Sequence, residues 1–166
     1  MDDVVRFGTL FLFLLIAVVG YGSGDDGQLP ADDSHLEFDA DLWVNTWVSI
    51  WNTYDLNQVD VLFLRDERLT YFSSEKEGII IGIDAVREHH RGFGFVEGGK
   101  QQPNKLWVKG VHTETFGTTA LVTAIWYFER PDGSVQRGPV TMVYVRQNEE
   151  YRIAHMNFST YHDKDK

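Results

Sequence analysis

The sequence has no cysteine, four prolines and ten fewer basic than acidic side chains among its 166 residues. Without cysteine, neither a disulfide framework nor a lipid-modified cysteine can form. The net charge of -10 argues against nucleic acid as a partner, because affinity for phosphates comes largely from Lys and Arg side chains. The chain must therefore fold on its apolar core alone, and no nucleic-acid partner is expected.

The sequence contains enough apolar residues to form such a core. Hydrophobic residues make up 43% of the chain and aromatic residues 14%, including five Trp, which excludes a disordered body. A chain of this length suits one domain with a sizeable core better than two. We therefore expect a single folded domain over residues 35–162, followed by a tail at residues 163–166.

The N-terminus has a different composition. Phe7 to Val19 is a 13-residue run without a charge, shorter than the roughly 20 residues that span a bilayer, and small residues follow it. This pattern predicts a signal peptide over residues 1–24 and a secreted or periplasmic protein without a membrane span after cleavage. An uncleaved anchor and a buried helix are the alternatives. Residues 25–34 combine acids, Gly and Pro, as a linker does.

Three helices are expected next. Ser34 and Glu37 match a capping box, and a second helix follows Asp55 and ends before Asp66. A third helix opens after Gly82. The first helix carries an apolar stripe at spacings of three and four: Ala40, Trp43, Trp47, Ile50, Trp51 and Tyr54. In the third helix His90 shares a face with the apolar Ile83, Val86 and Phe93, which predicts that His90 faces inward and His89 does not.

Strands dominate the rest of the chain. Residues 68–74 and 79–82 precede the third helix, and four long strands follow from Lys105, separated by turns at Gly117, Pro131 to Gly133 and Asn148-Glu149. Helices first and a run of strands last predict an α+β fold, with three N-terminal helices packed on a strongly curved antiparallel sheet.

The last hairpin determines where the polar residues of the final strand lie. If Asn148-Glu149 is a two-residue loop, Gln147 pairs with Glu150. A regular register then pairs Tyr144 with Ile153, Met142 with His155 and Val140 with Asn157. His155 and Asn157 are therefore predicted to share a face with Met142 and Tyr144.

Both faces of this hairpin are apolar, so both need cover. We expect the face with His155 and Asn157 to lie against the helices and enclose a cavity, and the other to form a homodimer. Exposure to solvent and a hydrogen-bonded histidine in the core are the alternatives for His155. The predicted dimer face consists of Thr141, Val143, Val145, Ala154, Met156 and Phe158.

Three stretches carry a family resemblance: WNTYDLNQVDVLF from Trp51, which follows the Trp-rich part of the first helix, IIIGIDAVREHH from Ile79 and YRIAHMNFS from Tyr151. With them the chain resembles the SnoaL-like, ketosteroid-isomerase-like superfamily, also called nuclear transport factor 2-like. The last is similar to the W-R-I-x-H-x-H-x-S ending of small stand-alone members and of the calcium/calmodulin-dependent kinase association domain. The family resemblance implies a conical fold, a homodimer and a pocket between the first helix and the bent sheet.

Departures from that family limit what can be carried over. Asn157 stands where the ending has its second His, and Trp126 and Met142 stand where kinase association domains have pocket arginines. The Tyr and Asp set of steroid isomerases cannot be placed on this chain, so their activity is not carried over.

For the site, His155 and Asn157 are the candidate catalytic residues, with His155 as a general base and Asn157 as a hydrogen-bond donor. The candidate pocket residues are Trp47, Trp51, Tyr71, His90, Trp126, Met142 and Tyr144. They suit a small apolar or aromatic molecule and a proton-transfer reaction of the isomerase, cyclase or hydratase type. Non-catalytic binding and a pure oligomerisation module remain open. No cofactor is expected, and the spacing of the histidines does not suggest a metal site.

Overall fold

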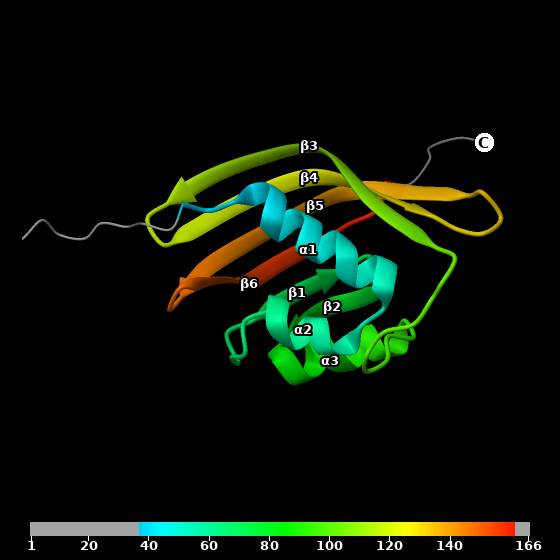
Figure 1. Cartoon of the computed structure of the whole chain (residues 1–166), viewed down its shortest axis with the longest axis horizontal. Coiled ribbons are helices and arrows are strands. Elements are labelled where there is room, and N and C mark those ends of the chain that lie inside the picture. The colour runs from blue at the N-terminus through cyan, green and yellow to red at the C-terminus, as the bar shows by residue number, and fades with distance from the viewer. Residues whose placement is uncertain (1–36, 162–166) are drawn as a thin grey trace, which may run out of the picture. The chain divides into compact units, whose positions relative to one another are not determined.

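The computed structural model describes residues 37–161. The helices are α1 (Ala40–Thr53), α2 (Leu56–Leu62) and α3 (Ile83–Gly92). The strands are β1 (Thr70–Ser73), β2 (Lys76–Ile81), β3 (Lys105–Phe116), β4 (Thr119–Glu129), β5 (Val135–Gln147) and β6 (Glu150–Phe158). Three helices on a bent, mostly antiparallel sheet confirm the predicted α+β fold (Figure 1).

Side chains at the helix starts explain where α1 and α2 begin. Asp39 caps α1, since its Oδ1 accepts a hydrogen bond from the Leu42 amide at 2.9 Å. Glu37, the second residue of the predicted capping box, therefore precedes the helix, and Ser34 itself lies outside the described residues. Asp55 caps α2 by accepting from the Asn57 amide at 3.0 Å, as predicted.

In α3, Gly82 precedes the first turn with a φ of 81°, a conformation that favours glycine. The helix buries Val86 and His90, whereas His89 is only partly buried. The predicted inward phase of His90 is confirmed.

The six strands form one sheet in the order β2-β1-β6-β5-β4-β3. Every neighbouring pair is antiparallel except β1 and β6, which run parallel with Thr70 opposite His155. The final strand thus lies between the short β1–β2 hairpin and the long strands. This parallel pair brings Tyr71 beside Met156, which lies near the C-terminal end of the chain.

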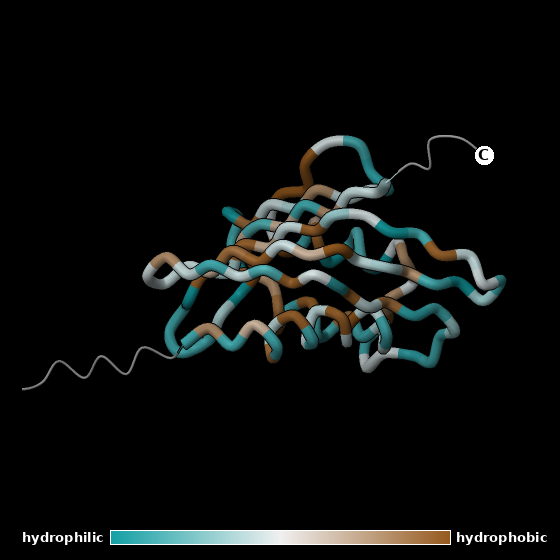
Figure 2. The backbone as a smooth tube through the Cα atoms, turned by 90° about the horizontal axis from the view of Figure 1, so that it is seen from above, coloured by the Kyte–Doolittle hydropathy of each residue, from teal (hydrophilic) through white to brown (hydrophobic). Residues whose placement is uncertain are grey.

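The core lies on one face of the sheet. α1 crosses this face, and α2 and α3 lie below β1 and β2 in the same view (Figure 1). Apolar and polar residues alternate along the strands (Figure 2), so that one side of each strand is buried. In β5 the buried side holds Val140, Met142 and Tyr144, with Thr141 and Val143 on the other side only partly buried.

A β-bulge changes the register of the last hairpin. Gln147 pairs with Glu150 and Tyr144 with Ile153, as predicted, but Val143 then pairs with His155. Ala154 is therefore an extra residue on β6, and every side chain after it changes face. The predicted pairing of Met142 with His155 is wrong, because Met142 pairs with Met156.

The predicted signal peptide, linker and tail lie outside the described residues. Among the helices of residues 37–161, none is both long and apolar enough to cross a membrane. Export stays a prediction.

Candidate ligand-binding site

A cavity of about 260 Å³ lies between α1, β1 and the inner face of β3, β4 and β6. Its walls combine mostly aromatic side chains with a polar group of residues. The lining residues are Trp51, Tyr54, Tyr71, Ser73, Ser74, Glu75, Phe93, Asn104, Leu106, Trp126, Phe128, Arg130, Gln136 and Phe158. A concave, largely aromatic site with a few polar groups has the composition of small-molecule pockets.

Flat aromatic rings form one side of this cavity. Phe158 lies nearly parallel to Trp126, with ring centroids 4.2 Å apart, and parallel to Trp51 at 6.0 Å. The Trp126 indole Nε1 donates a hydrogen bond to the Ser159 carbonyl at 2.8 Å. Gly138 allows this approach, since a Cβ at that position would lie 1.9 Å from the same oxygen. The aromatic wall is therefore held in place by packing and by a hydrogen bond.

Tyr71 adds a polar group to the buried part of the cavity. Burial raises the pKa of its phenol well above 10, so the hydroxyl is neutral at physiological pH. No hydrogen bond joins this hydroxyl to another residue in the range 37–161. It is therefore available as a donor to an oxygen or nitrogen atom of a bound molecule.

His90 lies behind Tyr71, with ring centroids 5.7 Å apart. Its Nδ1 is 2.8 Å from the Val86 carbonyl, which can only accept, so Nδ1 carries the proton. Burial lowers the pKa of His90 to about 4, which makes the ring neutral at pH 7. The His90 Nε2 and the Trp51 Nε1 are buried without a hydrogen-bond partner among the described residues.

The polar lining residues include a cation, Arg130, on one side of the Gln136 amide and an anion, Glu75, on the other side. Arg130 Nη2 donates to Gln136 Oε1 at 2.7 Å, and Gln136 Nε2 donates to Glu75 Oε1 at 3.3 Å. The guanidinium carbon of Arg130 lies 5.8 Å from the centre of the Phe128 ring. Sequence reasoning did not find these residues, because they stand in the β1–β2 turn and at the ends of β4 and β5, without a shared motif.

The predicted pocket residues are divided between the cavity and the core. Trp51, Tyr71 and Trp126 line the cavity. Four others are buried in the core and are not among the lining residues: Trp47, His90, Met142 and Tyr144. The Tyr144 hydroxyl donates to the Trp43 carbonyl at 3.3 Å, so Tyr144 stabilises the packing of α1 on the sheet.

His155 and Asn157 lie on the opposite face of the sheet. His155 Nδ1 forms a hydrogen bond with the Thr70 hydroxyl at 2.7 Å, and the exposed Asn157 accepts one from Ser159 at 2.9 Å. Their predicted place beside Met142 is wrong, because the bulge at Ala154 turns both residues outward. Met156 and Phe158, predicted for the outer face, are buried instead.

No protein-family model matches the sequence, and no curated protein matches it. Solved structures do match the fold. An NTF2-like superfamily protein from Salmonella enterica serovar Typhimurium superposes with a TM-score of 0.61 at 18% identity, over 75% of this chain and 89% of that one. A proposed ketosteroid isomerase from Parabacteroides distasonis superposes with a TM-score of 0.64 at 16% identity, over 81% of this chain and 96% of that one. The chain has the nuclear transport factor 2-like fold.

A third neighbour of this fold is a proposed calcium/calmodulin-dependent protein kinase II association domain from Xanthomonas campestris, with a TM-score of 0.57 at 12% identity. It matches over 75% of this chain and 84% of that one. At such identities the likeness establishes the nuclear transport factor 2-like fold, and the chemistry must be argued from this chain's own residues.

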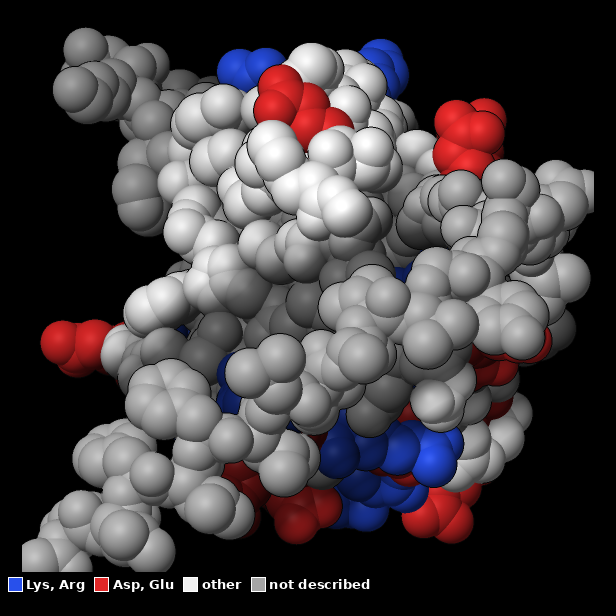
Figure 3. All heavy atoms as spheres, turned by 90° about the vertical axis from the view of Figure 1, so that its left-hand side faces the viewer, with Lys and Arg blue, Asp and Glu red and all other residues white. Residues whose placement is uncertain are grey.

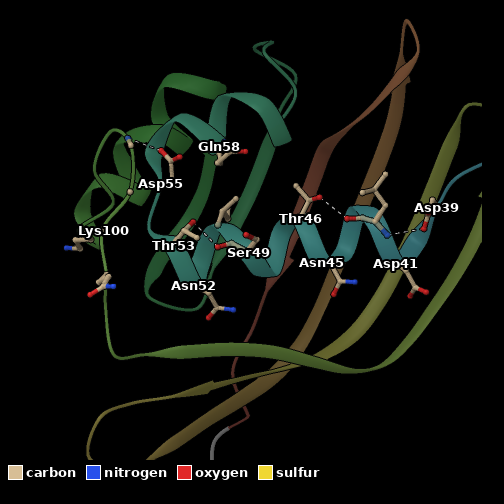
Figure 4. Close-up of a pocket in the computed structure, with 15 residues that line it drawn as sticks. Asp39, Asp41, Asn45, Thr46, Ser49, Asn52, Thr53, Asp55, Gln58 and Lys100 are labelled. Atoms are coloured by element: carbon tan, nitrogen blue, oxygen red, sulfur yellow. Dashed lines mark hydrogen bonds between the residues drawn. The ribbon is translucent and has the colours of Figure 1, made fainter.

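A second, wider hollow in this domain lies along the solvent-facing side of α1 (Figure 4). Its volume is about 1010 Å³, but it is broadly open to solvent. Figure 4 shows its polar side chains spread along α1, with Asp55 and Lys100 at one end. Such a surface buries little of a small molecule, so the aromatic cavity is the better candidate site.

Basic and acidic side chains lie next to each other on one face of the domain. On the face seen in Figure 3, a group of Lys and Arg side chains is bordered by Asp and Glu side chains. Arg68 forms an ion pair with Asp66 at 2.6 Å, and Arg152 forms one with Glu150. The Arg68 side chain also donates from Nε to Asp66 Oδ1 at 2.9 Å, and its backbone amide donates to the same oxygen at 2.8 Å. These hydrogen bonds lower the pKa of Asp66 to about 2. Within residues 37–161, no group of three His, Asp or Glu side chains is placed to hold a metal ion.

Proposed function

We propose that this nuclear transport factor 2-like domain binds a small molecule with a flat, apolar body in the cavity beside Trp51, Trp126 and Phe158. The observation that carries the proposal is the cavity of about 260 Å³ with an aromatic wall and the neutral Tyr71 hydroxyl. Aromatic rings recognise a flat body by stacking and edge contacts, and one buried donor fixes its orientation.

The size of the cavity restricts the ligand. Pockets for drug-sized ligands measure about 300–1,000 Å³, and this cavity is smaller. A body of one or two rings therefore suits it better than the four fused rings of a steroid.

Binding is favoured over proton transfer because the cavity lacks a buried base among its described lining residues. A proton-transfer enzyme needs a base within reach of the substrate, with a pKa near the working pH. Glu75 is the one carboxylate among the lining residues, and it is exposed. His90 is neutral, is not a lining residue and has a pKa of about 4.

The test is calorimetric titration of the protein with indole and with 4-methylphenol, which are small flat probes. Saturable binding to the unmodified chain is the expected result. Leu106→Phe should weaken it, because the larger side chain enters the cavity. Val108→Phe, two residues along the same strand and outside the lining, is the matched control. Absence of binding at millimolar probe would contradict the proposal, whereas turnover of a bound probe would establish an enzyme.

A further inference from the structure

We propose that the ligand of this cavity is a zwitterion of the aromatic amino acid class, whose charged head is held by Arg130 and Glu75. This inference rests on the proposed binding function and adds the chemistry of the head group. Its starting point is the Arg130–Gln136–Glu75 chain of hydrogen bonds, which places opposite charges on the two sides of one amide.

Arg130 is positioned to accept an anion. Its backbone is fixed by the β4–β5 turn, where its amide donates to the Ser134 carbonyl at 2.9 Å and its carbonyl accepts from Gly133 at 2.9 Å. One side-chain nitrogen, Nη2, binds Gln136, and the side chain forms no ion pair with a carboxylate among residues 37–161. Its remaining N–H groups can therefore bind a ligand carboxylate, for which the planar guanidinium is well suited.

Glu75 provides the complementary charge. Its Oε1 accepts hydrogen bonds from Gln136 at 3.3 Å and Ser74 at 3.4 Å. Its Oε2 receives none from the described residues. A ligand ammonium, which carries three donors and no acceptor, can bind this free oxygen.

Both charges belong to the same set of cavity residues as the aromatic wall. Trp51, Trp126, Phe128 and Phe158 would surround the ring, while Gln136 lies between the two head-group contacts. A ligand with a carboxylate alone would meet the like charge of Glu75, and one with an ammonium alone would meet that of Arg130. A zwitterion has favourable contacts with both.

The test compares four probes with the same phenyl ring by calorimetric titration: L-phenylalanine, 3-phenylpropionate, phenethylamine and ethylbenzene. We expect L-phenylalanine to bind most tightly and each missing charge to weaken binding about tenfold, the effect of losing one charged hydrogen bond at a partly exposed site. Equal binding of all four would overturn the head-group inference and leave the proposed function standing. If neither these four probes nor indole binds, the head-group inference and the proposed function are both overturned.

Charge-removing variants assign the two contacts. Arg130→Gln should weaken the binding of L-phenylalanine and 3-phenylpropionate about tenfold. It should not weaken phenethylamine, because it removes the like charge that this probe meets. Glu75→Gln should weaken the binding of L-phenylalanine and phenethylamine and should not weaken 3-phenylpropionate, because it removes the like charge that this probe meets. The matched controls are Arg137→Gln and Glu114→Gln, at exposed positions outside the cavity lining. A variant that weakens all the charged probes equally, or none, would contradict the assignment.

Discussion

The two faces of the sheet are both rich in apolar residues, but they are used differently. On the inner face, Trp126, Met142 and Tyr144 are at most 1% exposed. On the outer face Val143 and His155 are only partly buried, and Ile79 and Ile81 are 46% and 56% exposed. Apolar composition therefore does not by itself determine burial, because within residues 37–161 the helices cover one face only.

Polar groups differ between the faces as well. On the inner side, the described residues include a neutral phenol at Tyr71 and buried nitrogens without a hydrogen-bond partner at Trp47, Trp51, His89 and His90. On the outer face, His155 is paired with Thr70, and Asn157 with Ser159. Unpaired buried polar groups are rare, so the inner face is where a ligand has most to contribute.

The largest difference between the faces is expected for tryptophan truncation. Trp126→Ala should lower the free energy of unfolding by about 3–5 kcal/mol, because it removes a buried ring and leaves a cavity. Trp107→Ala, on a partly buried ring stacked on Tyr127, should lower it by about 1 kcal/mol. Denaturant unfolding measures both values. Equal losses would show that the outer face is as well packed as the inner one.

The next effect depends on pH. Burial lowers the pKa of His90 from 6.5 to about 4, so the unfolded chain binds a proton in this range before the folded chain does. Stability should therefore fall as pH drops from 6.5 to 4, by a contribution on the order of 3 kcal/mol. His90→Phe should remove this contribution from unfolding curves measured across that range. The exposed His112→Gln is the control, and an unchanged slope for His90→Phe would contradict the prediction.

A smaller effect tests the bulge. Met156→Gln should destabilise the fold by about 2–3 kcal/mol, because an amide would be buried without a partner. His155→Gln should change stability by about 1 kcal/mol or less, since it removes one hydrogen bond on a partly exposed face. Thermal unfolding distinguishes the two. The reverse ranking would mean that His155, rather than Met156, faces the core.

The smallest effect on the fold is expected on the outer face, where we propose contact with a second copy of the chain. Exposed Phe72, Ile79 and Ile81 adjoin the partly buried side chains of β5 and β6 there, and an apolar surface of this kind favours association. Val143→Glu should yield monomer while changing monomer stability little. Light scattering gives the mass, and a soluble monomer for the unmodified chain would remove the basis of this proposal.

Much of the fold could be predicted from local patterns. The Trp stripe of α1, the cap at Asp55, the inward phase of His90 and the strand order along the chain all follow from periodicity and turn residues. The α1 start was misplaced because Ser34 and Asp39 are both good caps, and only the packing of the helix selects one of them.

The candidate site was predicted in part. Trp51, Tyr71 and Trp126 carry a recognisable signal, because large aromatic residues in apolar patterns face a core or a cavity. Arg130, Gln136 and Glu75 carry none, because polar and charged residues near turns are ordinarily solvated. Their proximity depends on the parallel pairing of β1 with β6, which brings the β1–β2 turn towards the end of β4.

The sequence by itself determined which residues are apolar, how they repeat along helices and strands, and where turns end them. Those are local properties, set by backbone geometry and side-chain type over a few residues. Only the tertiary structure decided which face His155 and Asn157 occupy. One extra residue at Ala154 reverses the alternation, and bulges arise from the twist and pairing of neighbouring strands rather than from a local signal.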